Sequence, residues 1–493
     1  MKSICLRTIL ISIRPVLTAV LAAMPVSLVL VTSVTFTHEY TVTVDEELRV
    51  LSVEARVDRR IGNLRARSNQ AGRYVSRITD CESNTALARR DRRLLLPDRG
   101  IRCLAYRVDL ERAARAERRN TSLARDNIIL SPSLWLWRPP VYGDDSIDIR
   151  FELPDGMRVS VPWQTIGRTS AQASTRPIAD ANHHFRLSAS PRSGQGLVAF
   201  GRFDHREIPV TGAVLRVAVM TPRSGVSDER WFDWIRDTAS QLTLAYGRFP
   251  NPSPQIVVLP VGRSGWNRSS AVLFGRVLRD GGESVELFVN EHRPIGEFYA
   301  DWTATHEFSH LMLPYVTNRQ RWISEGFAQY YQNVLMARAG TYTPQMAWQK
   351  LYEGFERGRQ SRPELSPNEA SSRGVGRATM KIYWSGAVLA LMADVELRRR
   401  SGGRESLDDV LDRLQTCCLP SARVWNGREL FVKLDTLVDQ PLFLTLYESY
   451  ADEQGFPDYM PTLDRLGVRI ERGTVAFSDD AEFADLRKAI TLY

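Results

Sequence analysis

Alternation of apolar and polar residues dominates the first part of the chain. It runs through residues 39–57, 103–111, 146–163 and 213–220, and turn-forming sequences such as LPDG and WRPP break it up. A period of two places successive side chains on opposite faces of a strand, as in a half-buried sheet. The pattern therefore predicts a β-rich, sandwich-like domain at residues 37–215, interrupted by an arginine-rich helical or loop insertion.

The apolar spacing changes in the middle of the chain. Helical spacing at residues 228–249 is followed by short apolar runs at 254–261, 270–278 and 284–291, and then by a further helical pattern. Strands that alternate with helices indicate an α/β layer, which we place at residues 216–340.

The remaining chain has helical spacing almost throughout. We therefore predict a helical C-terminal domain at residues 341–493. Its last part, residues 469–493, is expected to form a short strand pair and a helix.

The N-terminus has the pattern of an export signal. Lys2, Arg7 and Arg14 precede the segment Pro15–Phe36, which contains no charged residue. About 22 helical residues span roughly 33 Å, enough to cross a bilayer. The basic residues ahead of it favour a cytoplasmic N-terminus and an extracytoplasmic remainder, periplasmic or secreted.

Residues 1–36 are accordingly predicted to be a signal peptide or a membrane anchor, and the sequence leaves both open. If the segment is not cleaved, it attaches the protein to a membrane. A buried hydrophobic helix is disfavoured by the position and length of the segment.

The composition is that of a folded protein with several domains: 493 residues, 43% hydrophobic and 25% charged. The formal net charge of +8 comes largely from arginine, much of it within residues 56–125. Acidic residues are interspersed there, and no nucleic-acid-binding motif is present. We therefore predict no nucleic-acid partner.

The cysteines indicate no structural zinc site. Cys5 lies in the leader, and Cys81 and Cys103 are spaced as a loop-closing disulfide could be. Cys417 and Cys418 are adjacent, and a disulfide between neighbours is uncommon. Since no C-x-x-C pair or Cys/His cluster occurs, any metal must be held by histidine and carboxylate.

The sequence HEFSH contains two histidines that could hold one ion. His306 and His310 are four residues apart, so both imidazoles project from the same face of a helix. Glu307 lies one step around that helix and could reach an attacking water without being a ligand.

A third ligand is offered by Glu325, at the start of the next predicted helix, with Ser324 as its N-cap. Residues 311–324 leave room for the chain to turn back. Two neutral nitrogens, one carboxylate and an open fourth position are typical of catalytic zinc. We predict one Zn²⁺ per chain.

Histidines are otherwise scarce. None of the seven follows His310, so a tyrosine or an arginine must stabilise the transition state. Tyr383, just ahead of a strongly apolar helix, is the best candidate. The strand at residues 284–291 either lies along the cleft and pairs with an extended substrate or is an ordinary sheet strand.

Two other interpretations are weaker. His306 and His310 could be satisfied polar residues on a buried helix, with Glu325 favoured by the helix dipole, but this explains each residue separately and not their combination. A serine hydrolase centred on Ser264 is disfavoured because the G-x-S-x-G turn is missing.

The motifs HEFSH, WISEGFAQYY and YWSGAVLALMADVELRRRSGGRESLDDVL resemble those of gluzincin metallopeptidases. The resemblance is closest to the glycyl aminopeptidase family and more distant to the aminopeptidase N family. It implies an α+β multidomain chain with a β-rich N-terminal domain, a thermolysin-like zinc domain and a helical C-terminal domain. His306, His310 and Glu325 would be ligands, Glu307 the base and Tyr383 the oxyanion donor.

The chain departs from these families in three ways. The gap between His310 and Glu325 is shorter than usual, and the C-terminal segment is too short for the PDZ domain that often ends glycyl aminopeptidases. The acidic, glycine-rich motif that grips a free amino group is also not visible, and residues 267–278 contain no acid in its place.

We therefore predict a zinc-dependent peptidase that acts on peptide or protein substrates, is exported or membrane-anchored, and has no assigned amino-end specificity. The alternative is a membrane-tethered, non-catalytic peptide-binding protein on the same fold. The sequence does not determine the oligomeric state.

Overall fold

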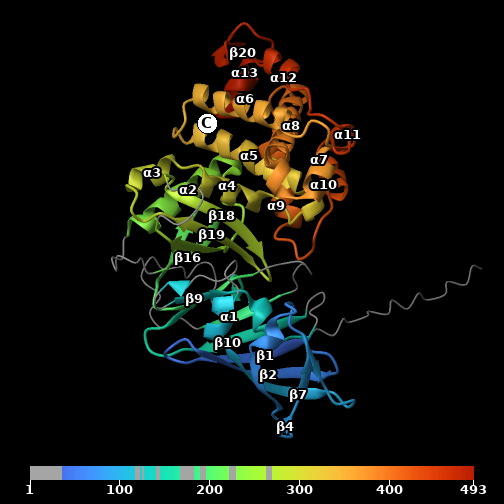
Figure 1. Ribbon diagram of the computed structural model, residues 1–493. Helices are drawn as coiled ribbons and strands as arrows, with labels where there is room; N and C mark the ends of the chain where they lie inside the picture. The colour runs from blue at the N-terminus through green and yellow to red at the C-terminus, as the bar shows by residue number, and fades with distance from the viewer. Residues whose placement is uncertain are drawn as a thin grey trace, which may run out of the picture. The chain divides into compact units, whose positions relative to one another are not determined.

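The computed structural model describes residues 36–492 except for 117–122, 125–126, 140–144, 167–182, 189–195, 221–228 and 263–268. From Phe36 onward the chain forms one compact unit (Figure 1). The predicted signal peptide or anchor lies outside the described residues, apart from Phe36 itself. In the part of the chain that is described, no helix is both long enough and apolar enough to cross a membrane.

The N-terminal part of the described chain contains two large sheets. One has the strand order β12-β13-β10-β1-β2-β7-β3-β4, and the other has the order β11-β14-β9-β8. The strands of the first sheet are β1 (Thr37–Val44), β2 (Val50–Ile61), β3 (Val75–Asp80), β4 (Thr85–Ala86), β7 (Ile101–Asp109), β10 (Ser146–Glu152), β12 (Gln164–Thr165) and β13 (His184–Leu187). Those of the second are β8 (Leu123–Ala124), β9 (Asn127–Leu130), β11 (Arg158–Ser160) and β14 (Val198–Gly201).

The two sheets share one hydrophobic core, as the alternating pattern predicts. Val42 and Leu51 of the first sheet are fully buried in the same cluster as Val159 and Phe200 of the second. Alternate residues of β1 and β2 point into this cluster while their neighbours are more exposed. The β-rich N-terminal part is therefore confirmed.

The described part of the arginine-rich segment divides between strands, loops and short helices, so the prediction of a helical or loop insertion is right for only part of it. Besides β2, β3 and β7, it forms the short pair β5 (Ala88–Arg90) and β6 (Arg93–Leu95), and it contains α1 (Leu110–Ala116) and a 3₁₀ helix at Ala71–Arg73. Arginines alternate here with buried apolar residues, as Arg56 does with Val57. A disulfide joins Cys81 to Cys103 across this region.

A five-stranded sheet follows, in the order β15-β16-β17-β19-β18. Its three inner strands are parallel to one another, and β18 pairs antiparallel with β19 at one edge. The strands are β15 (Asp204–Val210), β16 (Ala213–Val219), β17 (Gln255–Pro260), β18 (Val272–Arg279) and β19 (Glu283–Val289). The helices that lie next to this sheet are α2 (Arg230–Tyr246), α3 (Ile295–Ala300) and α4 (Thr303–Ser309) (Figure 1).

The two faces of this sheet have different neighbours. Val217 and Leu287 pack among the helices, in a cluster that includes Phe308 of α4. Val257, on the opposite face, packs against Ala199 of β14. Both faces of the parallel strands are therefore buried, as expected for such strands. The predicted domain boundaries at residues 215 and 340 stay predictions.

The C-terminal part is helical, which confirms the predicted α+β organisation. Its helices are α5 (Arg321–Arg338), α6 (Pro344–Gln360), α7 (Pro367–Arg373), α8 (Val375–Ser401), α9 (Leu407–Cys418), α10 (Gly427–Asp435), α11 (Phe443–Tyr450), α12 (Met460–Arg465) and α13 (Ala484–Thr491). The predicted strand pair and final helix are present as β20 (Val468–Glu471), β21 (Thr474–Phe477) and α13. A disulfide joins Cys417 to Cys418 at the end of α9.

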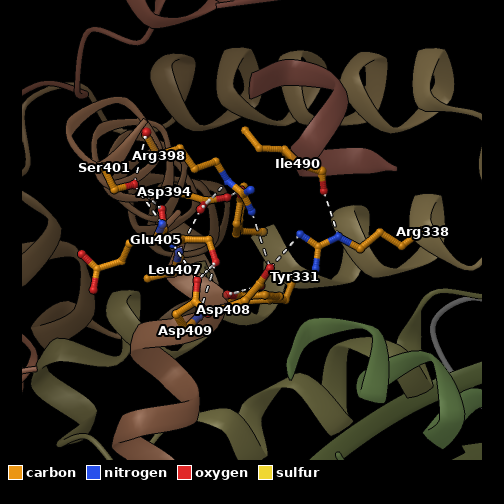
Figure 2. A network of polar contacts seen from close by, with 12 residues as sticks. Tyr331, Arg338, Asp394, Arg398, Ser401, Glu405, Leu407, Asp408, Asp409 and Ile490 are labelled. Atoms are coloured by element: carbon orange, nitrogen blue, oxygen red, sulfur yellow. Dashed lines mark hydrogen bonds and ion pairs between the residues drawn. The ribbon is translucent and has the colours of Figure 1, made fainter. Parts of the chain in front are cut away.

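A buried network of charges joins α5, α8 and α9 (Figure 2). Asp394 accepts hydrogen bonds from Arg398 and from the Tyr330 hydroxyl, at 3.0 and 2.7 Å. Asp408 accepts one from the Tyr331 hydroxyl at 2.9 Å and forms an ion pair with Arg338 at 2.9 Å. Two arginines thus balance two aspartates, as burial of charge requires.

Two glycines let α5 and α8 approach closely. A Cβ atom added to Gly386 of α8 would lie 2.2 Å from the carbonyl oxygen of Trp322, and one added to Gly326 of α5 would lie 2.2 Å from the Gly386 Cα atom. Neither glycine has a positive φ. Glycine is required at both positions because of space alone.

We expect Gly386→Ala to lower the free energy of unfolding by about 1–3 kcal/mol, because the two helices must move apart. Urea denaturation of the purified protein measures this change. Gly376→Ala, which lies before the kink at Ala378 in α8, is the control, since its Cβ would meet nothing within 4 Å. Equal stability of the two variants would contradict the close contact.

Candidate metal centre

The first two predicted ligands lie where α4 ends. His306 is in the last turn of α4, and His310 is its C-cap and the first residue of a short 3₁₀ helix, His310–Met312. The N–H of His310 still donates to the carbonyl oxygen of His306, one helical turn before it, and the two rings are adjacent, with centroids 4.8 Å apart and planes nearly perpendicular. Both imidazoles therefore project from the same face of the helix, as the spacing predicts.

The third predicted ligand comes from α5, which begins earlier than predicted. The helix begins at Arg321, so Glu325 lies in its second turn and Ser324 is not the N-cap. The N-cap is Gln320, whose side chain accepts a hydrogen bond from the Gly427 N–H and donates one to the Tyr447 hydroxyl. Tertiary contacts, which the local sequence does not reveal, therefore set this boundary.

The structure brings the three predicted ligands together. Oε2 of Glu325 lies 3.4 Å from Nε2 of His306 and 3.5 Å from Nε2 of His310. Ligand atoms about 2.0–2.2 Å from a tetrahedral zinc ion are about 3.3–3.6 Å apart. The donor set and its spacing therefore fit such an ion, and all three ligand atoms lie within 4.8 Å of one another.

Each ligand has a partner on its outer side. Nδ1 of His306 lies 3.2 Å from Oε1 of Gln332, and Nδ1 of His310 lies 2.9 Å from Oγ of Ser324. When these oxygens accept from Nδ1–H, each Nε2 lone pair is left for a metal. The second oxygen of Glu325, Oε1, accepts a hydrogen bond from Nη2 of Arg321 at 2.5 Å.

Burial and charge set the protonation of the site. Burial raises the pKa of Glu307 to about 7, with help from Glu325 and against the effect of His306. Burial also lowers the pKa of His310. For Glu325, burial acts to raise the pKa, but the hydrogen bonds with the two imidazoles outweigh it and hold the pKa well below its usual value.

Tyr383 lies within α8, and not just ahead of a helix as predicted. Its ring is stacked on that of His306, with centroids 5.8 Å apart and an angle of 13° between the planes. Burial raises the pKa of its hydroxyl, and the nearby carboxylates of Glu325 and Glu307 raise it further. A hydrogen bond with Glu325 adds to this shift, so the hydroxyl is protonated at neutral pH and lies next to a proposed metal ligand.

A cleft of about 310 Å³ opens beside these residues. Glu307, His310, Glu325 and Tyr383 line it. One wall is the edge strand β18, from Phe274 to Arg279. Of the two alternatives for the strand at 284–291, the ordinary sheet strand holds, because β19 lies between β17 and β18; the strand that borders the cleft is β18, one of the two edge strands of this sheet.

Three residues of the site were not found from the sequence. Gln332 and Arg321 contact the ligands, and Gly275 on β18 faces Glu307. Only Arg321 carried a sequence signal, since it lies four residues before Glu325 on one helix face. The contacts of Gln332 and Gly275 depend on how helices and strands pack.

Comparisons with known proteins support a peptidase. The sequence profile of the M61 glycyl aminopeptidase family matches residues 314–389, a span that includes Glu325 and Tyr383 and begins after both histidines. No curated protein matches the sequence at a significant level.

The fold has a similar solved structure, an aminopeptidase N family protein from Idiomarina loihiensis. The TM-score is 0.63 at 13% sequence identity, over 88% of this chain and 79% of that chain. At this identity the likeness concerns the fold. The profile match supports a peptidase, and the structural likeness supports a fold like that of the aminopeptidase N family protein.

Proposed function

We propose that this protein is a zinc-dependent peptidase with a thermolysin-like catalytic domain, which hydrolyses peptide bonds with a metal-activated water. The observation that supports this proposal most strongly is the position of three side chains. His306, His310 and Glu325 come from two different elements, and their ligand atoms lie at separations that suit one ion. When bound there, zinc would lower the pKa of a water molecule towards about 7 and polarise a peptide carbonyl.

Glu307 acts as the general base in this proposal. Its side chain lines the cleft beside the ligands, and its pKa of about 7 suits a group that takes a proton and then returns it. It would accept the proton of the attacking water and pass it to the leaving amine.

Gly275 makes room for this base. A Cβ atom at residue 275 would lie 2.4 Å from Cγ of Glu307 and 2.9 Å from its Oε1 atom. The carboxylate therefore lies directly against the edge strand β18. A substrate that follows this strand would pass within reach of Glu307.

Tyr383 donates to the oxyanion in this proposal. The stacking of its ring on His306 holds it beside the metal ligands, and its hydroxyl keeps its proton at neutral pH. A donor in this position stabilises the negative charge that develops on the carbonyl oxygen.

The second candidate function is that of a non-catalytic peptide-binding protein, which would bind peptides in the cleft without hydrolysing them. The retention of Glu307 and Tyr383 together with all three ligands favours the enzyme. Mapping by mass spectrometry of the bonds cut in a denatured protein mixture, with and without chelator, decides between them. The same digest separates cleavage at chain ends from cleavage inside.

We also propose that the protein is exported or anchored through residues 1–36. The disulfide between Cys81 and Cys103 supports an oxidising compartment, where such bonds persist. Sequencing the N-terminus of the mature protein distinguishes a cleaved signal from a retained anchor.

We expect Glu307→Gln to retain one zinc ion per chain and to lose peptide hydrolysis by about 10²–10⁴-fold, because only the proton acceptor is removed. Elemental analysis and a chromogenic peptide assay measure the two quantities. His306→Ala is the contrasting control and should lose both. Full activity in metal-replete Glu307→Gln would remove Glu307 from this role.

For Gly275→Ala, we expect kcat to fall by about 10²-fold with the zinc content unchanged, because the new methyl group displaces Glu307 from its position. Gly296→Ala is the control, since its Cβ would meet nothing within 4 Å. Unchanged kcat in a folded Gly275→Ala protein would contradict the proposed position of the base.

Tyr383→Phe should lower kcat by about 10²–10³-fold and leave KM nearly the same, because a donor to the oxyanion acts mainly in the transition state. The phenyl ring preserves the stacking on His306, so zinc content should not change. Steady-state kinetics on one peptide test this. A normal kcat would assign the oxyanion to another donor.

A further inference from the structure

The two oxygens of Glu325 have different partners. Oε2 faces both imidazoles, at 3.4 and 3.5 Å, whereas Oε1 accepts the hydrogen bond from Arg321 at 2.5 Å. The side chain of Glu325 is 8% exposed. The hydrogen bond from the guanidinium uses one lone pair of Oε1 and orients the carboxylate so that Oε2 is the oxygen turned toward the imidazoles.

Arg321 is itself held in place. It is the first residue of α5, and the contact with Glu325 joins positions i and i+4 on one helix face. The residues on either side anchor this turn: Gln320 through Gly427 and Tyr447, and Trp322 through a hydrogen bond from its indole N–H to Asn368 at 2.9 Å. The backbone at Arg321 is therefore anchored on both sides, and the guanidinium reaches Glu325 from this turn.

This arrangement bears on the coordination shell. A carboxylate that binds through both oxygens fills two positions of an ion, whereas one that binds through a single oxygen leaves more of the shell open. A catalytic zinc site needs an open position beyond its three protein ligands. The cleft into which that position would open is lined by Arg321 as well as by Glu325.

We propose that Arg321 is a positioning residue: it holds Glu325 as a single-oxygen ligand and thereby strengthens zinc binding at this site. The inference rests on the proposed zinc-dependent function. In this proposal Arg321 acts through Glu325 and does not itself contact the ion.

Charge alone predicts the opposite effect. A guanidinium close to a divalent cation repels it, so removal of Arg321 should tighten zinc binding if electrostatic repulsion is its main effect. If Arg321 orients Glu325, its removal should weaken zinc binding, because partners of metal ligands typically contribute about 10–100-fold in affinity. Whether zinc binding becomes tighter or weaker in the variant therefore distinguishes electrostatic repulsion from orientation of Glu325.

The experiment compares Arg321→Met with Arg319→Met. Arg319 is exposed two residues earlier, so both variants lose one positive charge from the same turn region. Zinc affinity is measured by competition with a chromogenic chelator, and the coordination geometry by the visible absorption of the cobalt(II) form. We expect about 10–100-fold weaker zinc binding and an altered cobalt spectrum in Arg321→Met alone.

A second pair of variants tests whether Arg321 acts through Glu325. In a Glu325→Ala background, Arg321→Met should cause no further loss of zinc affinity, whereas a direct or general structural effect would add to the loss. Arg321→Lys keeps the positive charge but loses the planar guanidinium with its paired N–H donors, so it should bind zinc with intermediate affinity. This variant replaces Arg321→Met in the experiment if Arg321→Met does not fold. Thermal unfolding of the metal-free proteins reports on folding.

Two results would overturn the inference: equal or tighter zinc binding by folded Arg321→Met, or an undiminished further loss in the Glu325→Ala background. Failure of the wild-type protein to bind zinc would instead overturn the proposed function. The two failures are thus distinguishable in one titration series.

Discussion

The close contact of α5 and α8 is the constraint on which the site depends. Gly326 follows Glu325 directly, and Gly386 lies three residues after Tyr383, so the contact between the two glycines brings the proposed metal ligand and the proposed oxyanion donor together. A larger side chain at either position would push the helices apart. Since the imidazoles come from α4, only the packing of three helices makes the ligand set complete.

Helix α5 also connects the site to the rest of the helical region. Its first turns carry Arg321 and Glu325, and its later turns carry Tyr330, Tyr331 and Arg338 of the buried network in Figure 2. Buried charges cost free energy unless they are paired, and Glu325, Asp394 and Asp408 each have a cationic or hydroxyl partner. Buried charges can stay paired only if the side chains keep fixed positions. Such fixed positions suit α5, which carries the proposed ligand Glu325.

Several features followed from the sequence because they are local. Alternation predicted the strands of the N-terminal sheets, and the spacing of His306 and His310 predicted that their rings share a helix face. Other features were mispredicted or left open because they depend on distant contacts. The start of α5 is set by Gln320 against Gly427 and Tyr447, and the strand at the cleft is β18 because β19 is covered on both sides.

The sequence by itself determined which groups are available: two imidazoles four residues apart, a carboxylate after the turn, and no histidine further on. It could do so because helix geometry converts spacing into direction over one or two turns. Only the tertiary structure decided that Glu325 meets both rings with one oxygen and Arg321 with the other, and that Gly275 borders Glu307. These contacts join residues on separate elements, and their distances depend on how those elements pack.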